Sequence, residues 1–250
     1  MKVCVLSSGS KGNSTLVITD KVKILIDLGT TTSYVEAALN NLNVDVKEIS
    51  HILITHSHVD HIKGLKVFIK RYNPVILVTE DMKNVLEKEL GNFRYEYYED
   101  KKAIIDDLTV NVIKTSHDAE ESIGFVLTNN NSSMVYITDT GYFKILSNNN
   151  LYVLESNHDI KMLMDGPYPY YLKQRVQGDK GHLSNKQASD YLCKFIGDNT
   201  RKIVFAHISE HNNSYEKVIE TFNEELSKND MKFDDVLIAK QNETTEVIEV

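Results

Sequence analysis

The chain has 250 residues, a formal net charge of −8 and a hydrophobic content of 41%. Its length favours one large domain over residues 1–250, which buries enough surface to fold without disulfides. The acidic balance argues against a protein that binds nucleic acid chiefly through phosphate contacts. No apolar run is long enough to span a membrane, and the two cysteines lie in apolar surroundings typical of reduced thiols. We therefore expect a cytoplasmic protein without membrane contact.

Short apolar runs rich in Val, Ile and Leu predict strands along the whole chain. In the first half these runs cover 2–6, 15–19, 22–27, 51–55, 75–78 and 109–114. In the second half they cover 124–127, 134–138, 151–154, 202–206 and 236–239.

Helix caps and apolar stripes predict four helices among these strands. The first helix begins at a capping box of Ser33 with Glu36, and the second covers 81–90 and stops at Gly91. The third covers 183–196 and has a capping box of Ser184 with Gln187, and the fourth begins at Ser214. Strands in both halves with helices among them predict sheets covered by helices, rather than an all-β or all-α domain.

Several predicted strands end in a side chain that can bind a metal ion. These residues are Asp27, His56, His117, Asp139, Glu155 and His207. One such residue alone is usually a turn or surface residue, but the repeated pattern predicts that the strand ends converge on one rim.

The stretch ILITHSHVDHIKG, residues 52–64, is the strongest signal in the chain. It contains His56, His58, Asp60 and His61 directly after an apolar strand. Residues i and i+2 of an extended segment point the same way, so His56 and His58 can share one ion while the turn brings Asp60 and His61 to a second site. Imidazole and carboxylate ligands suit zinc, and manganese or iron with lower preference.

The order of these residues along the chain resembles the motifs of the metallo-β-lactamase superfamily. The matching segments are LIDLG (25–29), THSHVDH (55–61), the strand end at His117, ITDTG with Asp139, and AHIS with His207. The resemblance implies an α/β (α+β) fold, a four-layer αββα sandwich with a dinuclear metal site at one edge of the sheets. It implies that His56, His58 and His117 hold one metal, that Asp60, His61 and His207 hold the other, and that Asp139 bridges both.

Two positions separate branches of this superfamily. Asp139 occupies the bridging position, near which class B1 and B2 β-lactamases have a cysteine. His58 stands where flavo-diiron oxidoreductases have a glutamate, which indicates a hydrolytic, zinc-type site. Glyoxalase II is not excluded by the ligands alone.

Three further segments, SSGSKGNS (7–14), LESNHD (154–159) and GHLSN (181–185), are similar to those of the YycJ-type (WalJ-type) metallo-hydrolases, relatives of RNase Z. This resemblance implies phosphodiester hydrolysis on nucleic acid, and we expect a DNA exonuclease with two divalent ions, Zn²⁺ or Mn²⁺ with Fe as a further option. DNA is the expected partner, and no obligate protein partner is inferred. The sequence shows no inserted β-CASP domain and no counterpart of the flexible arm of RNase Z.

The resemblance also implies catalytic roles. Asp60 would steer the proton of the attacking water while also binding metal. His182, just before the helix that begins at Ser184, would protonate the leaving oxygen, and Glu155 would hold its tautomer. Without the resemblance, His182 is an ordinary loop histidine.

Four polar residues are predicted to line the substrate. The loop at 7–14 can present N–H groups to a phosphate, which places Ser10 and Asn13 on one side of the site. Ser209 and Asn212 would border the other side. The remaining histidines, His51, His158 and His211, are expected to be structural or peripheral.

Two alternative functions remain open: hydrolysis of a small phosphodiester or thioester, and a non-catalytic, metal-stabilised signalling role. The position of two basic stretches discriminates between nuclease and small-substrate hydrolase, because a nuclease needs them beside the metal rim. The stretches contain Lys63, Lys66, Lys70 and Arg71, and Lys173, Arg175, Lys180 and Lys186. We expect both to border the rim.

Overall fold

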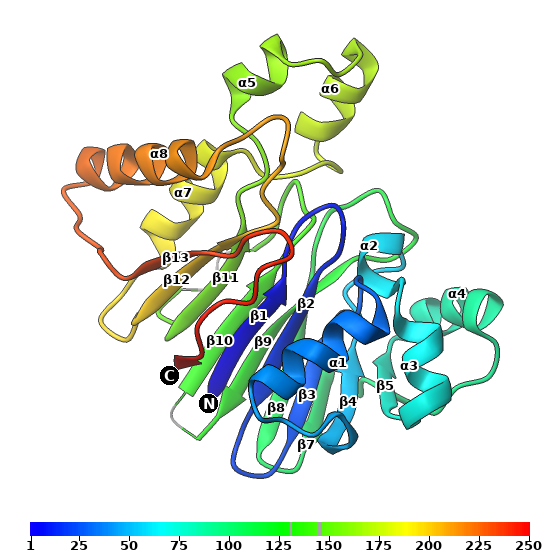
Figure 1. The fold of residues 1–250 in the computed structure, drawn as a ribbon. Helices are drawn as coiled ribbons and strands as arrows, with labels where there is room; N and C mark the ends of the chain where they lie inside the picture. Colours follow the sequence, from blue (N-terminus) through cyan, green and yellow to red (C-terminus); the bar gives the residue numbers. More distant parts are fainter. Residues whose placement is uncertain (131, 145–146) are drawn as a thin grey trace.

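Two seven-stranded sheets face each other in the computed structural model, which describes residues 1–130, 132–144 and 147–250 (Figure 1). The first sheet has the order β14 (Ile248–Glu249), β1 (Lys2–Ser7), β2 (Ser14–Ile18), β3 (Lys23–Ile26), β4 (Ile49–Leu53), β5 (Val75–Val78) and β6 (Tyr95–Tyr97). The second has the order β13 (Val236–Ile238), β12 (Lys202–Ala206), β11 (Leu151–Glu155), β10 (Ser132–Ile137), β9 (Ile123–Asn129), β8 (Leu108–Lys114) and β7 (Lys102–Ile105).

Both sheets are mixed. Strands β1 to β3 are antiparallel and β3 to β6 are parallel, while β7 to β10 are antiparallel and β10 to β13 are parallel. Parallel neighbours end at the same edge of a sheet, so residues that follow them are brought together.

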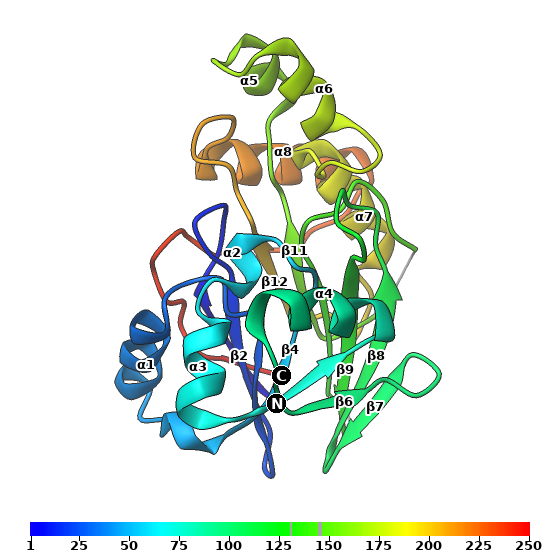
Figure 2. The same ribbon diagram turned by 90° about the vertical axis from the view of Figure 1, so that its right-hand side faces the viewer.

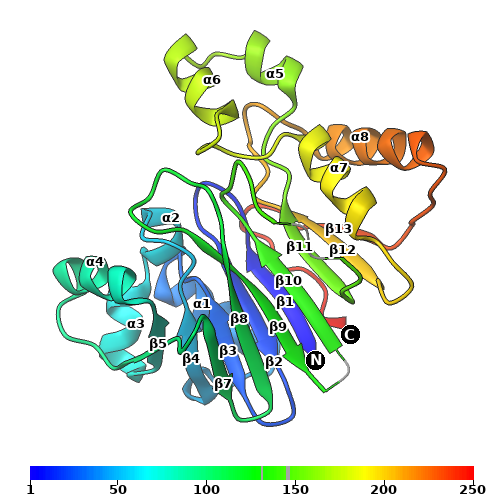
Figure 3. The same cartoon turned by 180° about the vertical axis from the view of Figure 1, so that it is seen from behind.

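Helices cover the outer faces of both sheets and complete four layers. Beside the first sheet lie α1 (Thr32–Asn41), η1 (Val46–Glu48), α2 (Val59–Ile62), α3 (Leu65–Tyr72) and α4 (Glu80–Leu90). Beside the second lie α7 (Asn185–Phe195) and α8 (Tyr215–Lys228), as Figure 3 shows from behind. Three buried clusters fill the spaces between layers, including Val17, Phe125 and Val153 between the sheets. The predicted αββα sandwich is confirmed.

Two further helices, α5 (Ile160–Asp165) and α6 (Tyr170–Gln177), project beyond the sandwich (Figure 2). The sequence did not predict them, because they are short and bury little: α6 has no buried residue and α5 buries Leu163. Helices α2 and α3 and the short strands β6, β7 and β14 were also not predicted from the sequence. No helix in the described residues is both long and apolar enough to cross a membrane.

The helix caps test the sequence predictions directly. The capping box of Ser184 with Gln187 and the start at Ser214 are confirmed. The predicted capping box of Ser33 with Glu36 is wrong, because Thr31 is the N-cap of α1 and its hydroxyl accepts from the N–H of Tyr34. Thr31 has the extended conformation that an N-cap needs, so the helix begins two residues earlier. A single domain over 1–250 stays a prediction.

Candidate metal centre

Six strands of the two sheets lead to one edge of the sandwich, and each is followed by a polar residue predicted from the sequence. Asp27 follows β3, His56 follows β4, His117 follows β8, Asp139 follows β10, Glu155 ends β11 and His207 follows β12. Asp27, Asp139 and His207 have φ values of 58°, 52° and 48°. This left-handed backbone is unfavourable for residues other than glycine, and it turns the chain sharply at the strand end so that the side chain faces the centre.

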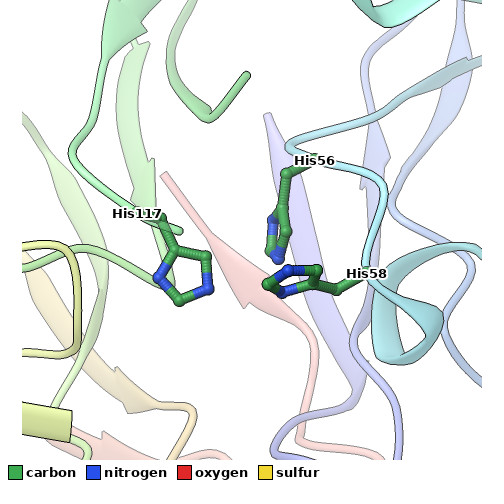
Figure 4. Close-up of side chains that lie close together, drawn as sticks. All are labelled: His56, His58 and His117. Atoms are coloured by element: carbon green, nitrogen blue, oxygen red, sulfur yellow. The ribbon is translucent and has the colours of Figure 1, made fainter. Parts of the chain in front are cut away.

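The first group of potential ligands consists of His56, His58 and His117. One ring nitrogen from each lies within 4.8 Å of the others. Figure 4 shows the three rings facing a common space, with His56 and His58 from one sheet and His117 from the other. His58 is the N-cap residue of α2, so the short helix begins within the ligand segment and contains Asp60 and His61.

The second group consists of Asp60, His61, Asp139 and His207, again with ligand atoms within 4.8 Å. Asp139 Oδ2 lies 3.0 Å from His61 Nε2, and Asp139 Oδ1 lies 3.9 Å from His117 Nε2. Asp139 is therefore placed between the two groups, as a bridging ligand must be. The two clusters are consistent with a dinuclear metal site.

The histidines present Nε2 to the centre because the protein binds Nδ1. His61 Nδ1 lies 2.7 Å from Asp27 Oδ2, His117 Nδ1 lies 3.1 Å from the Gly181 carbonyl, and His56 Nδ1 lies 3.1 Å from Thr55 Oγ1. The Nε2 atoms of His56 and His207 are buried and have no hydrogen-bond partner among the described residues. A buried, unsatisfied nitrogen is costly, and a bound cation removes that cost. These donors fit a metal site.

The charges of the buried groups also fit bound cations. Burial, with the nearby His61, holds the pKa of His56 well below its usual value, and burial lowers the pKa of His117. Burial also opposes the charged form of His207, but Asp139 and other carboxylates outweigh it and raise its pKa to about 10. A proton on His207 thus balances the carboxylates without metal, and a cation would replace it.

Glu155 is a fully buried hub beside this centre. It accepts hydrogen bonds from the backbone N–H groups of Asp139, Thr140 and Leu183, and contacts Nδ1 of both His182 and His207 at 3.1 and 3.3 Å. Burial opposes its charge, but His182 and His207 lower its pKa to about 2. Glu155 also forms a third cluster with Asp139, His182 and His207, whose potential ligand atoms lie within 4.8 Å of one another. Five hydrogen-bond donors, however, already contact the two oxygens of Glu155.

His182 differs from the other histidines because it is partly open to solvent. Its side chain is 19% exposed, and Nδ1 lies 3.1 Å from Glu155 Oε2. In the described part of the chain Nε2 has no partner. His182 thus contacts Glu155 at the centre while part of its side chain stays open to solvent.

The predicted substrate residues lie around the centre in two different ways. Ser10 is exposed and lines a pocket of about 510 Å³ together with Asp60 and Lys63. Asn13 is 1% exposed, and its amide bonds the Gly9 backbone and lies 3.0 Å from His61 Nε2. Its contacts position the loop and His61, and substrate binding by Asn13 stays a prediction.

Ser209 and Asn212 are also buried. Ser209 Oγ accepts from the N–H of Asn212 at 3.2 Å, and the Asn212 carbonyl accepts from Asp159 N at 2.9 Å. These bonds hold the loop after β12 against the start of α5. A role for either residue in substrate binding stays a prediction.

The two basic stretches border the centre only in part. Lys63 lines the pocket beside Asp60, and Lys180 lines a pocket that contains His117. Arg175 reaches Asp118, whose Oδ1 lies 3.4 Å from His117 Nε2. By contrast, Arg71 pairs with Glu36 on the outer helices and Lys186 with Asp190 on α7, because a helix turns successive residues to different faces.

Sequence reasoning missed two residues that hold the centre, Thr55 and Asp118, and it did not predict the contact of Asp27 with His61. Asp27 accepts from the Thr55 N–H and hydroxyl, both at 2.8 Å, as well as contacting His61. The signal was present for Asp27, which follows an apolar strand in LIDLG. For Asp118 no signal existed beyond its place after His117.

Comparison with known proteins places this geometry in a family. The metallo-beta-lactamase superfamily profile matches residues 8–171. "Exodeoxyribonuclease YycJ" of Bacillus anthracis is 36% identical over 221 residues, covering 85% of this chain and 84% of that protein. "Exodeoxyribonuclease WalJ" of Streptococcus pneumoniae strain D39 is 32% identical over 241 residues, covering 92% and 90%. Human tRNase Z, short form, shares the fold with a TM-score of 0.67 at 14% identity, covering both chains fully.

Proposed function

Because the chain belongs to the metallo-β-lactamase superfamily, we propose that it is a metal-dependent phosphodiesterase that degrades DNA from a strand end. Two relatives that align over most of the chain are named exodeoxyribonucleases, which supports this substrate. The observation that carries the proposal is His182, which contacts Glu155 beside the metal clusters and has part of its side chain open to solvent. A scaffold that only binds metal needs no such group.

We assign two divalent ions to the centre. His56, His58 and His117 would hold one, Asp60, His61 and His207 would hold the other, and Asp139 would contribute between the two groups. When bound, such ions lower the pKa of a coordinated water toward 7 and neutralise charge on a phosphate. Five imidazoles with carboxylates suit zinc, and manganese and iron accept the same donors.

Asp60 is placed to handle the proton of the attacking water. Its side chain is 24% exposed, whereas that of Asp139 is 3% exposed. Asp60 Oδ2 lies 3.7 Å from His207 Nε2 and 3.8 Å from His61 Nε2, so it borders the centre and faces solvent. It can therefore accept a hydrogen bond from a water and orient it toward a bound phosphate.

His182 donates a proton at Nε2 to the oxygen that leaves after P–O cleavage. Glu155 accepts a hydrogen bond from the Nδ1–H of His182 and stabilises the imidazolium through its negative charge. Glu155 itself stays ionised because neighbouring histidines lower its pKa to about 2. The pair thus supplies an acid that is separate from the metal ligands.

The test compares two substrates in the metal-loaded His182→Ala protein. A DNA strand has a poor leaving group, so its hydrolysis should slow by roughly 10²–10⁴-fold. A bis(4-nitrophenyl) phosphate needs little proton help and should lose much less, while the metal content stays that of the wild type. His51→Ala is the matched control, because His51 lies within β4, outside the ligand groups, and contacts Ser50.

The outcomes separate the alternatives. Equal losses on both substrates would remove His182 as the leaving-group acid. A wild-type protein that hydrolyses the small diester but no DNA would favour a small phosphodiester as substrate. A metal-loaded protein without activity on either would favour a binding role.

A further inference from the structure

Four lysines without an acidic partner gather beside the candidate centre. Elsewhere the surface lysines are often paired, as in Lys2 with Glu249 and Lys240 with Glu243. The unpaired lysines beside the centre are Lys101, Lys114, Lys144 and Lys180, each exposed and without an ion pair in the described residues. They come from four separate segments, and of the four only Lys180 belongs to a basic stretch named in the sequence.

These lysines line two adjoining pockets, here named the lysine groove. The outer pocket, of about 530 Å³, contains Lys101, Lys114 and Lys144 and no acidic side chain. The inner pocket, of about 520 Å³, shares Lys101 and Lys114 with it and adds Lys180 and His117. The groove therefore runs along the carboxyl half of β8 to a potential metal ligand.

Acidic residues occur only in the inner pocket of the groove. These are Asp81, Glu120 and Glu121, and Thr79 donates a hydrogen bond to Glu121. The positive charge is thus strongest in the outer pocket, on a protein whose net charge is −8. Helices α7 and α8 cover β11 and β12 but leave the outer face of β8 open (Figure 3). A polyanion can reach the groove from solvent.

An exposed aromatic ring lies in the outer pocket. Tyr142 is 61% exposed and follows Asp139 by three residues. The Thr140 hydroxyl donates to the Tyr142 carbonyl at 2.7 Å, and Ser116 N donates to Thr140 Oγ1, so the turn is fixed to the end of β8. An exposed tyrosine beside cationic side chains is the arrangement that binds unpaired bases by stacking.

We propose that the lysine groove binds a single strand of DNA as it enters or leaves the centre. The lysines contact backbone phosphates and Tyr142 stacks on a base next to the scissile phosphate. The inference rests on the proposed nuclease function and names the path of its substrate. The positive charge of the lysines favours a polyanion as the ligand. The exposed ring of Tyr142 favours an unpaired strand over a duplex, because it stacks on unpaired bases.

A binding experiment tests the groove independently of catalysis. The probe is a fluorescent oligothymidylate with phosphorothioate linkages that resist hydrolysis, and its affinity for the metal-loaded protein is measured by anisotropy across salt concentrations. The Lys101→Ala/Lys114→Ala variant loses two phosphate contacts. The slope of log association constant against log salt concentration should therefore become less steep by about 1.4. The same loss makes binding roughly 20-fold weaker at 0.1 M salt.

Lys47→Ala/Lys194→Ala is the matched control. It removes the same charge at exposed positions: Lys47 precedes β4 at the end opposite His56, and Lys194 lies in the last turn of α7. Its salt slope should equal that of the wild type. Equal slopes in the groove variant and the control would overturn the inference.

Tyr142 gives a second readout. Tyr142→Ala should weaken oligothymidylate binding about tenfold, whereas Tyr142→Phe keeps the ring and should retain wild-type affinity. The groove variant should also lose far more activity on DNA than on bis(4-nitrophenyl) phosphate. Equal losses of activity on both substrates would show that these lysines act through the centre or the fold. That result would overturn the proposal that the lysine groove binds DNA but would leave the nuclease proposal intact. A wild type that binds the probe in the groove but hydrolyses no DNA would instead refute the nuclease proposal.

Discussion

Histidines of the candidate centre contact the protein with one ring nitrogen and present the other ring nitrogen to the centre. For His61 and His117, Nδ1 contacts Asp27 and the Gly181 carbonyl, which fixes the ring and leaves Nε2 for a metal. The histidines could be predicted from H-x-H-x-D-H, because the ligands of one turn are neighbours in sequence. Their partners could not, because Asp27 lies 34 positions and Gly181 lies 64 positions away along the chain.

Asp27 is expected to act as a positioning residue for His61. Asp27→Asn keeps the size of the side chain but removes the charge that favours the Nδ1–H tautomer of His61. Loss of such a partner should weaken metal binding roughly 10–100-fold, measured by competition with a chromogenic chelator. Asp107→Asn is the control, since Asp107 also accepts from a threonine hydroxyl but lies at the far end of β8. Wild-type affinity in Asp27→Asn would contradict the positioning role.

At the scale of elements, strands were easier to predict than helices. Buried strands such as β5 and β12 appear in the sequence as unbroken apolar runs bounded by polar residues, and both were predicted with their observed bounds. Helix α3 was missed because its buried Leu65 and Phe68 are hidden among basic residues in the sequence. Helices α5 and α6 were missed because few of their residues are buried, so they lack the apolar stripe that identifies a helix.

The start of α1 provides a test at this scale. Thr31→Ala removes the hydroxyl that accepts from Tyr34 N and should lower the free energy of unfolding by about 1 kcal/mol, measured by urea denaturation. Ser33→Ala, two residues along the same helix, changes an exposed side chain that caps nothing and should cost less than about 0.5 kcal/mol. If Ser33→Ala lowered the free energy of unfolding more than Thr31→Ala does, Ser33 would be the N-cap, as predicted from the sequence.

At the scale of the whole molecule, the candidate centre joins the two sheets. His56, His58, Asp60 and His61 follow β4 of the first sheet, whereas His117, Asp139 and His207 follow strands of the second. The sequence showed that these strand ends converge, since each ends in a similar residue. It did not show the lysine groove, because Lys101, Lys114, Lys144 and Lys180 come from four separate segments that meet only in the folded chain.

Because the potential metal ligands come from both sheets, removal of metal bound at the centre should destabilise the entire fold. An ion present at 1,000 times its dissociation constant adds about 4 kcal/mol to the free energy of unfolding when it binds the folded state alone. In a chain of this size about 1 kcal/mol shifts the melting temperature by 2–4 °C, so EDTA should lower it by roughly 10 °C, and added zinc should restore it. Scanning calorimetry measures both shifts. Asp139→Asn loses the carboxylate between the two ligand groups, so its melting temperature should change much less on chelation. Identical melting of the wild type with and without EDTA would show that the two sheets are not joined through bound metal.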